Sequence, residues 1–599
     1  MSASLPRSTG QTFDSEHYDV VILGGGLAGL TLARHLLLDT DKRVLLLERN
    51  ASLPHHRQKV GESSVQLAGY YYSKVLDLEE LLLTEHFMKY NLRFYWKSGE
   101  RSNAGFEDYS QAYIRKFSNI ASYQLDRNEF ERAVLARNEE FERFTCLTAV
   151  TKIEAPLDGP GPHALAFAHR GEGREITADW VVDTTGRVRL LAKRRGMARK
   201  NPIRHGAFFW WVDGLVDIDK LTGQSRREVR LHPSRRETGH LPFWMATNHF
   251  MGEGFWFWVI PLQGKTSLGL VYDTEKISHG DVFSVEKATD WVCKEFPLFA
   301  RDLPAREVLD YGGYKDFSHD CSQTISRDGW ALAGEAGRFT DPLYSPGSDL
   351  ISIYNTLIVD AIQTGDADEL AAKTRLYEQL MKAAYAAYEP SYALSYDALG
   401  DPEVFSLKYG WELSVYFGFY VFPFINDLFT DRRFAVSYLK AFSKLGPMNR
   451  AVQQLLSDYF QWRKNAVGLP AEPVYFDFLR FGTLDAAEKT FYRVGADVAE
   501  ARRVLQDQLA NLDELARFLW ARVASVVLGE PAVMTCRPMI EAIDPNALTF
   551  DPAAMARGWA QADRSAPPWE WSFDPAVMDV FPSEVSAPDE VAAVAGAGA

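Results

Sequence analysis

The chain has 599 residues, about four domain-sized units, which is too long for a single small binding module. Hydrophobic residues make up 46% and charged residues 24%, a balance that excludes wholesale disorder, collagen and a polytopic membrane protein. The net charge of −15 provides no global basic field for a phosphate backbone, so we do not expect a nucleic acid partner.

The first residues of the chain do not resemble an export signal. Residues 1–14 are polar, carry one arginine and lack the apolar core of a signal peptide. The longest apolar stretches, 20–33 and 415–425, fall short of the ~20 residues of a membrane span. We therefore expect a cytoplasmic protein without integral membrane contact.

The next segments predict a βαβ unit. Residues 18–23 (YDVVIL) form a short β-branched run, 27–38 a helical apolar stretch, and 43–48 (RVLLLE) a second strand. Alternation of this kind is typical of a parallel sheet covered by helices.

A glycine motif joins the first strand to the helix. Gly24, Gly26 and Gly29 form GxGxxG: the first glycine permits a turn, the second lets backbone approach a pyrophosphate, and the third lets helix pack on strand. Glu48 ends the second strand, where a carboxylate can accept hydrogen bonds from ribose hydroxyls. The alternative is an ordinary glycine-rich turn, but strand, helix and acid together favour a dinucleotide site.

Downstream segments predict antiparallel sheets and then helices. Residues 144–183 contain three strand-like runs and the turn LDGPGPH, which predicts a small antiparallel sheet beside the first. A second antiparallel set is predicted at 207–212, 228–232, 255–261 and 267–273. Helical patterns dominate from about 350 to 530. From Ser565 onward the chain is rich in Pro and Ala and is not expected to bury enough surface to become ordered.

The four cysteines are scattered along the chain and include no CxxC pair. The sequence therefore indicates neither a zinc site nor a disulfide framework, and a reducing compartment fits best. No spacing of His, Asp or Glu indicates a metal site.

Several longer motifs follow one another in a characteristic order. They are VGESSVQLAGYYYSKVLDL (60–78), YQLDRNEFERAVL (123–135), VVDTTGR (181–187), WxWxIP (Trp256, Trp258, Ile260, Pro261) and WALAGEAGRFTDPLYSPGSDLI (330–351). Together with GxGxxG, they resemble the FAD-dependent monooxygenases of the hydroxybenzoate-hydroxylase type. Within that superfamily they resemble the flavin-dependent halogenases, including the tryptophan halogenases. The resemblance covers about residues 18–365.

The resemblance implies an α/β fold, with a Rossmann-like FAD-binding domain, an inserted antiparallel-sheet substrate domain and a C-terminal helical domain. The expected limits are a flexible N-terminus at 1–15, a discontinuous FAD-binding domain at 16–205 plus 325–365, a substrate domain at 206–324, a helical domain at 366–564 and a flexible tail at 565–599.

The resemblance also implies a set of FAD contacts. Glu48 and Arg127 would contact the adenosine half, and Gly334 and Glu335 would lie by the ribityl chain and pyrophosphate. Glu335 stands where the superfamily usually has Asp, which predicts reduced flavin affinity. The full expected set is Gly24, Gly26, Leu27, Ala28, Gly29, Glu48, Arg49, Arg57, Arg127, Asp183, Gly186, Gly334, Glu335, Pro342, Gly347 and Ser348. Arg57 belongs to the loop PHHRQKV (54–60), which either steadies the flavin or is a solvated surface loop.

The implied chemistry uses a flavin C4a-hydroperoxide formed from dioxygen and reduced FAD, which a separate NAD(P)H-dependent flavin reductase supplies. This species either oxygenates a substrate or oxidises chloride or bromide to hypohalous acid. In the halogenases a lysine holds that acid, and Lys89 in HFMKYNLRFYW (86–96) occupies this place. Partial burial would lower the pKa of its ammonium enough for N-halogenation. The alternative is a solvated lysine before a strand.

The loop DPLYSPG (341–347) departs from the DPLESTG of the tryptophan halogenases. Pro346 has no N–H to offer a halide, although Gly347 and Ser348 can still donate. Tyr344, which we assign as the second catalytic position, replaces the glutamate that assists attack by free indole. Free tryptophan is therefore not an expected substrate. Asp349 either adds negative potential near the halide or caps the following helix.

Two aromatic features remain open between packing and function. Trp256 and Trp258 lie two residues apart on a strand, so both indoles are expected on one side of the sheet. They form either a wall between substrate and flavin or a buried pair. The aromatic residues between Phe405 and Phe429 line either an apolar substrate tunnel or the surroundings of a helix buried on several sides.

Three functions are compatible with these observations. The first is a FAD-dependent oxidoreductase of secondary metabolism, of the halogenase-like monooxygenase branch, acting on an electron-rich aromatic substrate. That substrate would be a phenol or pyrrole, free or tethered to a carrier protein, and both halogenation and oxygenation remain open. The second is a flavin dehydrogenase or reductase of a lipophilic substrate, and the third is a non-catalytic flavin-binding partner module.

Overall fold

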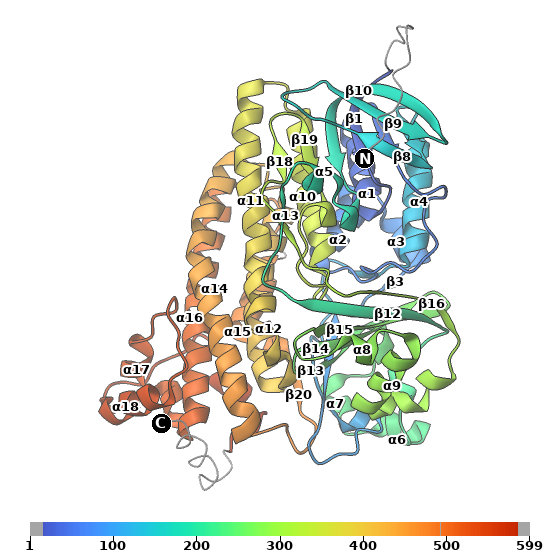
Figure 1. The fold of residues 1–599 in the computed structure, drawn as a ribbon. Helices are drawn as coiled ribbons and strands as arrows, with labels where there is room; N and C mark the ends of the chain where they lie inside the picture. Colours follow the sequence, from blue (N-terminus) through green and yellow to red (C-terminus); the bar gives the residue numbers. More distant parts are fainter. Residues whose placement is uncertain (1–15, 492, 585–599) are drawn as a thin grey trace. The chain divides into compact units, whose positions relative to one another are not determined.

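The computed structural model describes residues 16–491 and 493–584, and its contacts divide the chain into two compact units (Figure 1). The first unit combines 1–86, 125–202 and 317–385, and the second combines 87–124, 203–316 and 386–599. The expected flexible N-terminus and the last 15 residues of the expected tail lie outside the described residues.

An eight-stranded sheet organises the first unit. Its order is β18-β19-β10-β1-β2-β7, and β9 and β8 continue antiparallel from β10. The pairings β19–β10, β10–β1, β1–β2 and β2–β7 are parallel. The strands are β1 (Glu16–Leu23), β2 (Val44–Leu47), β7 (Phe144–Leu147), β8 (Val150–Glu154), β9 (His163–His169), β10 (Glu172–Asp183), β18 (Ile325–Ser326) and β19 (Trp330–Leu332).

The predicted βαβ opening is confirmed by β1, α1 (Leu27–Asp39) and β2. Strand β1 is buried from Val20 to Leu23, as expected for a central parallel strand covered on both faces. Helix α1 packs against α4 (Arg127–Glu139) and α10 (Pro346–Gln363). The antiparallel strands predicted within 144–183 also form. They are an extension of the same sheet and not a separate one, because the 12-residue β10 pairs with β9 at one end and with β1 at the other.

A second eight-stranded sheet organises the second unit, in the order β16-β12-β15-β14-β13-β4-β5-β20. Its strands are β4 (Leu92–Lys97), β5 (Tyr109–Tyr113), β12 (His205–Asp213), β13 (Thr247–Gly252), β14 (Phe255–Leu262), β15 (Lys265–Asp273), β16 (Val308–Tyr314) and β20 (Tyr475–Asp477). Alternate residues such as Phe208, Phe250 and Phe257 face a core shared with α9 (Val285–Glu295). Trp256 and Trp258 alternate with Phe257 on β14 and therefore face the opposite side of this sheet.

The strand predicted at 228–232 is wrong, because residues Arg226–Leu231 form helix α6. Ser225 and Glu228 make a capping box, in which the hydroxyl of Ser225 accepts from the Glu228 N–H and the carboxylate of Glu228 accepts from the Ser225 N–H. This reciprocal bonding satisfies two donors at the helix start and outweighs the β-branched content of the segment.

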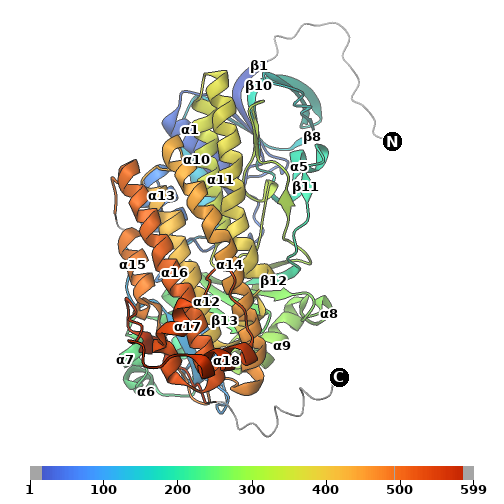
Figure 2. The ribbon, with the colours of Figure 1, turned by 90° about the vertical axis from the view of Figure 1, so that its left-hand side faces the viewer.

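Long helices complete the second unit. Helices α14 (Arg432–Ala466) and α16 (Val498–Leu528) lie side by side, with α12 (Pro402–Tyr416) packed against both (Figure 2). Of the ten aromatic residues from Phe405 to Phe429, all but Tyr416 are buried. Their burial favours the packing alternative for this segment.

The tail becomes ordered further than its composition suggests. Residues 565–584 are described, and Phe573, Val577, Met578 and Phe581 are buried. Four large apolar side chains within nine residues are enough to attach this stretch to the unit, a signal that the average Pro/Ala content hides.

The compact units divide the chain differently from the expected domain limits. Strands β4 and β5 join the second sheet, although residues 87–124 precede the expected substrate domain. The C-terminal helices fall in the same unit as that sheet. Within the described ranges, no helix combines the length and apolar character needed to cross a bilayer.

Candidate functional site

Two glycines of the GxGxxG motif are required by close packing. Gly24 has a φ of +109°, and a Cβ there would lie 2.7 Å from the carbonyl oxygen of Thr184. A Cβ on Gly29 would collide with the carbonyl oxygen of Gly24 and the hydroxyl of Thr184. These two positions therefore hold strand β1, helix α1 and the end of β10 together.

Gly26 has a different environment. It is the N-cap of α1, and a Cβ built there would meet nothing within 4 Å. The space in front of it adjoins the N–H groups of the first turn, including Leu27 and Ala28, which have no acceptor inside the helix. A helix N-terminus with open backbone before it suits a pyrophosphate, so the residues present fit FAD at this position.

The motif at 181–187 lies directly beside these glycines. The hydroxyl of Thr184 donates to the carbonyls of Leu23 (3.0 Å) and Gly24 (2.8 Å). Asp183 is fully buried and accepts from the N–H groups of Thr185 (2.9 Å) and Leu191 (2.7 Å). Burial raises the pKa of Asp183, and these hydrogen bonds oppose the rise. Asp183 thus shapes the turn; its contact with FAD stays a prediction, as does that of Gly186, which follows at φ +57°.

The third motif also reaches the start of α1. Gly334 has a φ of +59°, and a Cβ there would lie 3.2 Å from the side chains of Ala28 and Ile351. Glu335 follows it and is partly buried; burial raises the pKa of its carboxyl, against the opposing effect of Arg187. The structure therefore brings the glycine motif and the motifs at 181–187 and 330–351 together at the start of α1, as the resemblance implied.

The acidic and basic FAD candidates make the following contacts. Glu48 accepts from the N–H groups of Gly25 and Asn50, each at 2.8 Å, and so stands at the glycine turn. Arg127 donates to the carbonyl of Val60 at 2.7 Å and forms an ion pair with the buried Glu131. By contrast, Arg49 and Arg57 are exposed side chains. Their roles, like that of Glu48, remain predictions.

The loop at 341–347 forms an unusual entry to α10. The N–H of Ser345 donates to the carbonyl of Pro342 at 2.9 Å, and both Tyr344 (φ +68°) and Ser345 (φ +59°) have left-handed backbone. Such conformations cost about 1–3 kcal/mol each in residues other than glycine and are concentrated at functional sites. Pro346 is the first helical residue, so Gly347 and Ser348 provide the first N–H groups of α10.

Asp349 does not cap the helix that it belongs to, so the capping alternative is wrong. It lies within the first turn of α10, and its Oδ1 accepts from the N–H of Ala68 at 2.9 Å. It therefore satisfies a donor at the start of another helix, α2 (Gln66–Tyr70), which lacks a side-chain cap of its own. A contact between residues 281 positions apart gives no local sequence signal.

Lys89 lies in the second unit and is buried, with 3% of its surface exposed. The alternative of a solvated lysine is therefore wrong. Its N–H donates to the carbonyl of Ser122 at 2.7 Å, which fixes the backbone before β4. Burial, together with the nearby charge of Lys89, lowers the pKa of His249 to about 3. His249 is thus a neutral neighbour of the lysine at physiological pH.

The tryptophan pair faces one side of the sheet, as predicted, with ring centroids 5.6 Å apart. The indole of Trp256 donates to the hydroxyl of Tyr396 at 2.8 Å and lies 5.4 Å from the ring of His249. The indole of Trp258 donates to the hydroxyl of Ser267 at 3.1 Å. Both N–H groups are therefore used within the protein, and the wall function stays a prediction.

We expect acidification to destabilise the protein through His249. Its pKa is about 3 in the folded chain and 6.5 in the unperturbed state, so the unfolded chain binds more protons between these values. The free energy of unfolding should then fall as the pH drops from about 6.5, by about 1.4 kcal/mol per pH unit at most. Denaturant unfolding at pH 7, 6, 5 and 4 measures this slope. His249→Phe should flatten the slope and His240→Gln, at an exposed histidine, should not.

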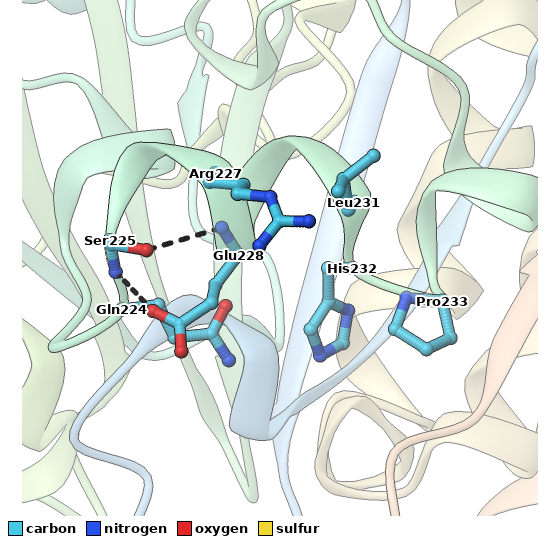
Figure 3. Close-up of a pocket in the computed structure, with 7 residues that line it drawn as sticks. All are labelled: Gln224, Ser225, Arg227, Glu228, Leu231, His232 and Pro233. Atoms are coloured by element: carbon cyan, nitrogen blue, oxygen red, sulfur yellow. Dashed lines mark hydrogen bonds between the residues drawn. The ribbon is translucent and has the colours of Figure 1, made fainter.

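A surface cleft of about 480 Å³ lies on the second unit and was not predicted (Figure 3). Its lining residues are Gln224, Ser225, Arg227, Glu228, Leu231, His232 and Pro233. The sequence prediction of a strand here concealed it, although the Ser225-x-x-Glu228 pattern was a usable sign of a helix start. Among the residues that the structure covers, no group of His, Cys, Asp or Glu could hold a metal ion.

The parallel sheet, the glycine turn and the two adjoining motifs at 181–187 and 330–351 define the first unit as a dinucleotide-binding fold. No protein-family model matches the chain. Flavin-dependent halogenase chlA of Dictyostelium discoideum is 24% identical over 455 residues, which cover 69% of this chain and 73% of that protein. The 1H-pyrrole-2-carbonyl-(peptidyl-carrier protein) chlorinase of Pseudomonas fluorescens is 25% identical over 374 residues, which cover 59% and 78%.

Solved structures agree with these relatives in fold. The crystal structure of halogenase PltM, known also in complex with phloroglucinol and FAD, gives a TM-score of 0.56 at 16% identity. The match covers 83% of this chain and 96% of PltM. The resemblance to flavin-dependent halogenases and the α/β fold are thereby confirmed: the chain is related to enzymes of that kind.

Proposed function

We propose that the chain is a FAD-dependent halogenase of secondary metabolism, acting on an electron-rich aromatic or pyrrole substrate that is free or tethered to a carrier protein. The observation that carries the proposal is the buried Lys89 in the same unit as Trp256 and Trp258. Lysine side chains are almost never fully buried unless their ammonium is paired with another group. Its place in the sequence is that of the halogenase lysine, and the relatives act on comparable substrates, including a pyrrole on a carrier protein.

FAD would be held by the first unit. Gly26 and the N-terminus of α1 would bind its pyrophosphate and Glu48 its ribose, while Gly334 lets its own segment pack closely against Ala28 at the start of α1. When bound and reduced by a separate NAD(P)H-dependent reductase, FAD supplies the reaction with oxidising power from dioxygen.

Lys89 would act on the oxidised halide. Its ammonium donates a hydrogen bond to the oxygen of hypohalous acid, which holds the acid and makes the halogen more electrophilic. The neutral ring of His249 adds no second positive charge beside the lysine. Trp256 and Trp258 would keep the substrate away from the cofactor, so that it meets the halogen and is not hydroxylated directly.

Oxygenation is a second candidate, and Pro346 favours it. The missing N–H at this position removes one donor that a halide would use. The deciding assay combines the protein with FAD, an NADH-driven reductase, dioxygen and a panel of phenols, pyrroles and carrier conjugates. Chloride, bromide or neither is added, and product mass is measured. A halide-dependent mass gain supports halogenation. A gain of one oxygen atom without halide supports oxygenation. Turnover in the absence of dioxygen supports a dehydrogenase.

Pro346→Thr should strengthen halide binding. Threonine restores an N–H at the first position of α10, where it adds to those of Gly347 and Ser348 and to the positive end of the helix dipole. We expect the Kd for chloride to fall by about tenfold or more, because one further hydrogen bond to an ion contributes about 1.5–3 kcal/mol. A chloride titration of flavin fluorescence measures it. Pro346→Ala is the matched variant and should give the same gain, whereas unchanged titrations in both would contradict this account of the loop.

A further inference from the structure

Arginine side chains are concentrated on the surface of the second unit around α6 and α7 (Arg235–Thr238). Residues 224–240 contain five arginines and two glutamates, in a chain whose net charge is −15. We use the name arginine face for the exposed members of this group and their neighbour Arg115, as follows: Arg115, Arg226, Arg227, Arg230 and Arg236.

Only one of the five arginines in this stretch is needed by the fold. Arg235 is buried, lies 4.5 Å from the ring centre of Phe243 and forms an ion pair with Asp219. Val229 turns inward from α6 and packs on the core beneath the sheet. The remaining four arginines point outward, and none of them forms an ion pair with any residue in the described ranges.

The arginine face includes one arginine from a distant segment and is accompanied by exposed apolar side chains. Arg115, from the segment after β5, donates to the carbonyl of Arg236 at 3.0 Å, which joins the two parts of the face. Leu231, the last residue of α6, is 60% exposed, and Leu241, shortly after α7, is 38% exposed. The cleft described above opens at the same place, with Arg227 and Leu231 on its wall (Figure 3).

We propose that the arginine face docks an acidic carrier protein that presents the substrate as a thioester; this inference rests on the proposed function. Unpaired arginines around exposed leucines match the composition of protein interfaces, in which arginine and large apolar residues are enriched and lysine is depleted. Exposed arginines gathered on one face attract an acidic partner and favour the orientation in which its acidic surface meets them. The net negative charge of the chain disfavours binding of a nucleic acid, because the phosphate charges of a nucleic acid extend beyond the arginine face.

The charge of the arginine face can be reversed by substitutions that do not destabilise helix α6. Arg226 and Arg227 are the first two residues of α6, where acidic side chains interact favourably with the helix dipole. The test variant is therefore Arg226→Glu/Arg227→Glu. Its matched control is Arg432→Glu/Arg503→Glu, which makes the same charge change at two exposed arginines on α14 and α16 of the same unit.

The probe is a peptidyl carrier protein bearing a pyrrole-2-carbonyl thioester. We expect the wild-type protein to bind it, with affinity that falls as salt rises from 50 to 500 mM. The Arg226→Glu/Arg227→Glu variant should bind about tenfold more weakly or worse, whereas the control should match the wild type. The ratio of turnover on the tethered substrate to turnover on free pyrrole should fall by the same factor.

Equal binding by the two double variants, or no binding of the carrier to the wild type at 50 mM salt, would overturn the proposal. So would selective binding to phosphatidylserine vesicles or to single-stranded DNA in place of the carrier, which would assign the face to a membrane or a nucleic acid. Binding does not require catalysis. Carrier binding without halogenation of any substrate would support the docking surface and refute the proposed function. Halogenation of free pyrrole without carrier binding would support the proposed function and refute the docking surface.

Discussion

Lys89→Ala is expected to lower halide-dependent product formation by about 100-fold or more, the range for removing a group that donates or moves a proton in a reaction. The side chain is buried, so no other cation can enter its position from solvent. Flavin binding, which we assign to the first unit, should be unchanged. Single-turnover product mass with bromide measures the loss, and flavin fluorescence measures the binding.

The control for this variant is Lys294→Ala, at an exposed lysine on α9 of the same unit, which should retain full activity. Lys89→Arg separates two chemical roles, because arginine keeps a hydrogen-bonding cation but does not lose its proton to form an N-halogen bond. Recovery of activity in the arginine variant would indicate hydrogen bonding alone. Full activity in Lys89→Ala would remove Lys89 from the mechanism.

Gly26→Ala should abolish tight FAD binding, with at least a tenfold rise in Kd, and leave the fold intact. The new methyl group would meet no protein atom within 4 Å, but it would occupy the space that we assign to the pyrophosphate. The cost to helix capping is below about 1 kcal/mol. Flavin titration and thermal unfolding of the flavin-free protein check the two halves of this expectation.

Two further glycines serve as controls. Gly173 on β10 is equally unobstructed and belongs to the same unit, so Gly173→Ala should change neither flavin affinity nor stability. Gly29→Ala should instead destabilise the protein by about 1–3 kcal/mol or more, since its Cβ collides with the Gly24 carbonyl. Normal FAD affinity in Gly26→Ala would contradict the cofactor position that we propose.

The parts of the fold that were predictable carry local signals. The βαβ opening follows from a β-branched run, a helical apolar stretch and three glycines within 31 residues, 18–48. The meeting of the motifs at 181–187 and 330–351 was expected from the resemblance, and Thr184, Gly334 and Ala28 show the contacts that achieve it.

The parts that were not predictable depend on distant partners. The burial of Lys89 does not follow from its local sequence; its backbone N–H donates to the carbonyl of Ser122, and its charge acts on His249, two residues that lie further along the chain. The hydrogen bond from the Ala68 N–H at the start of α2 to Asp349 also depends on a residue far along the chain. At 228–232, a local capping box existed but was outweighed in our prediction by β-branched and apolar residues.

The pairing of β20 with β5 has a consequence for synthesis of the chain. Ser110 and Val474, which are bonded beside this pairing, are 364 residues apart. While the ribosome synthesises the intervening residues, the edge of β5 that will pair with β20 has no partner strand from its own chain. An unprotected margin of this kind recruits strands from neighbouring nascent chains, so protein shortened before residue 475 should be recovered largely as insoluble aggregates.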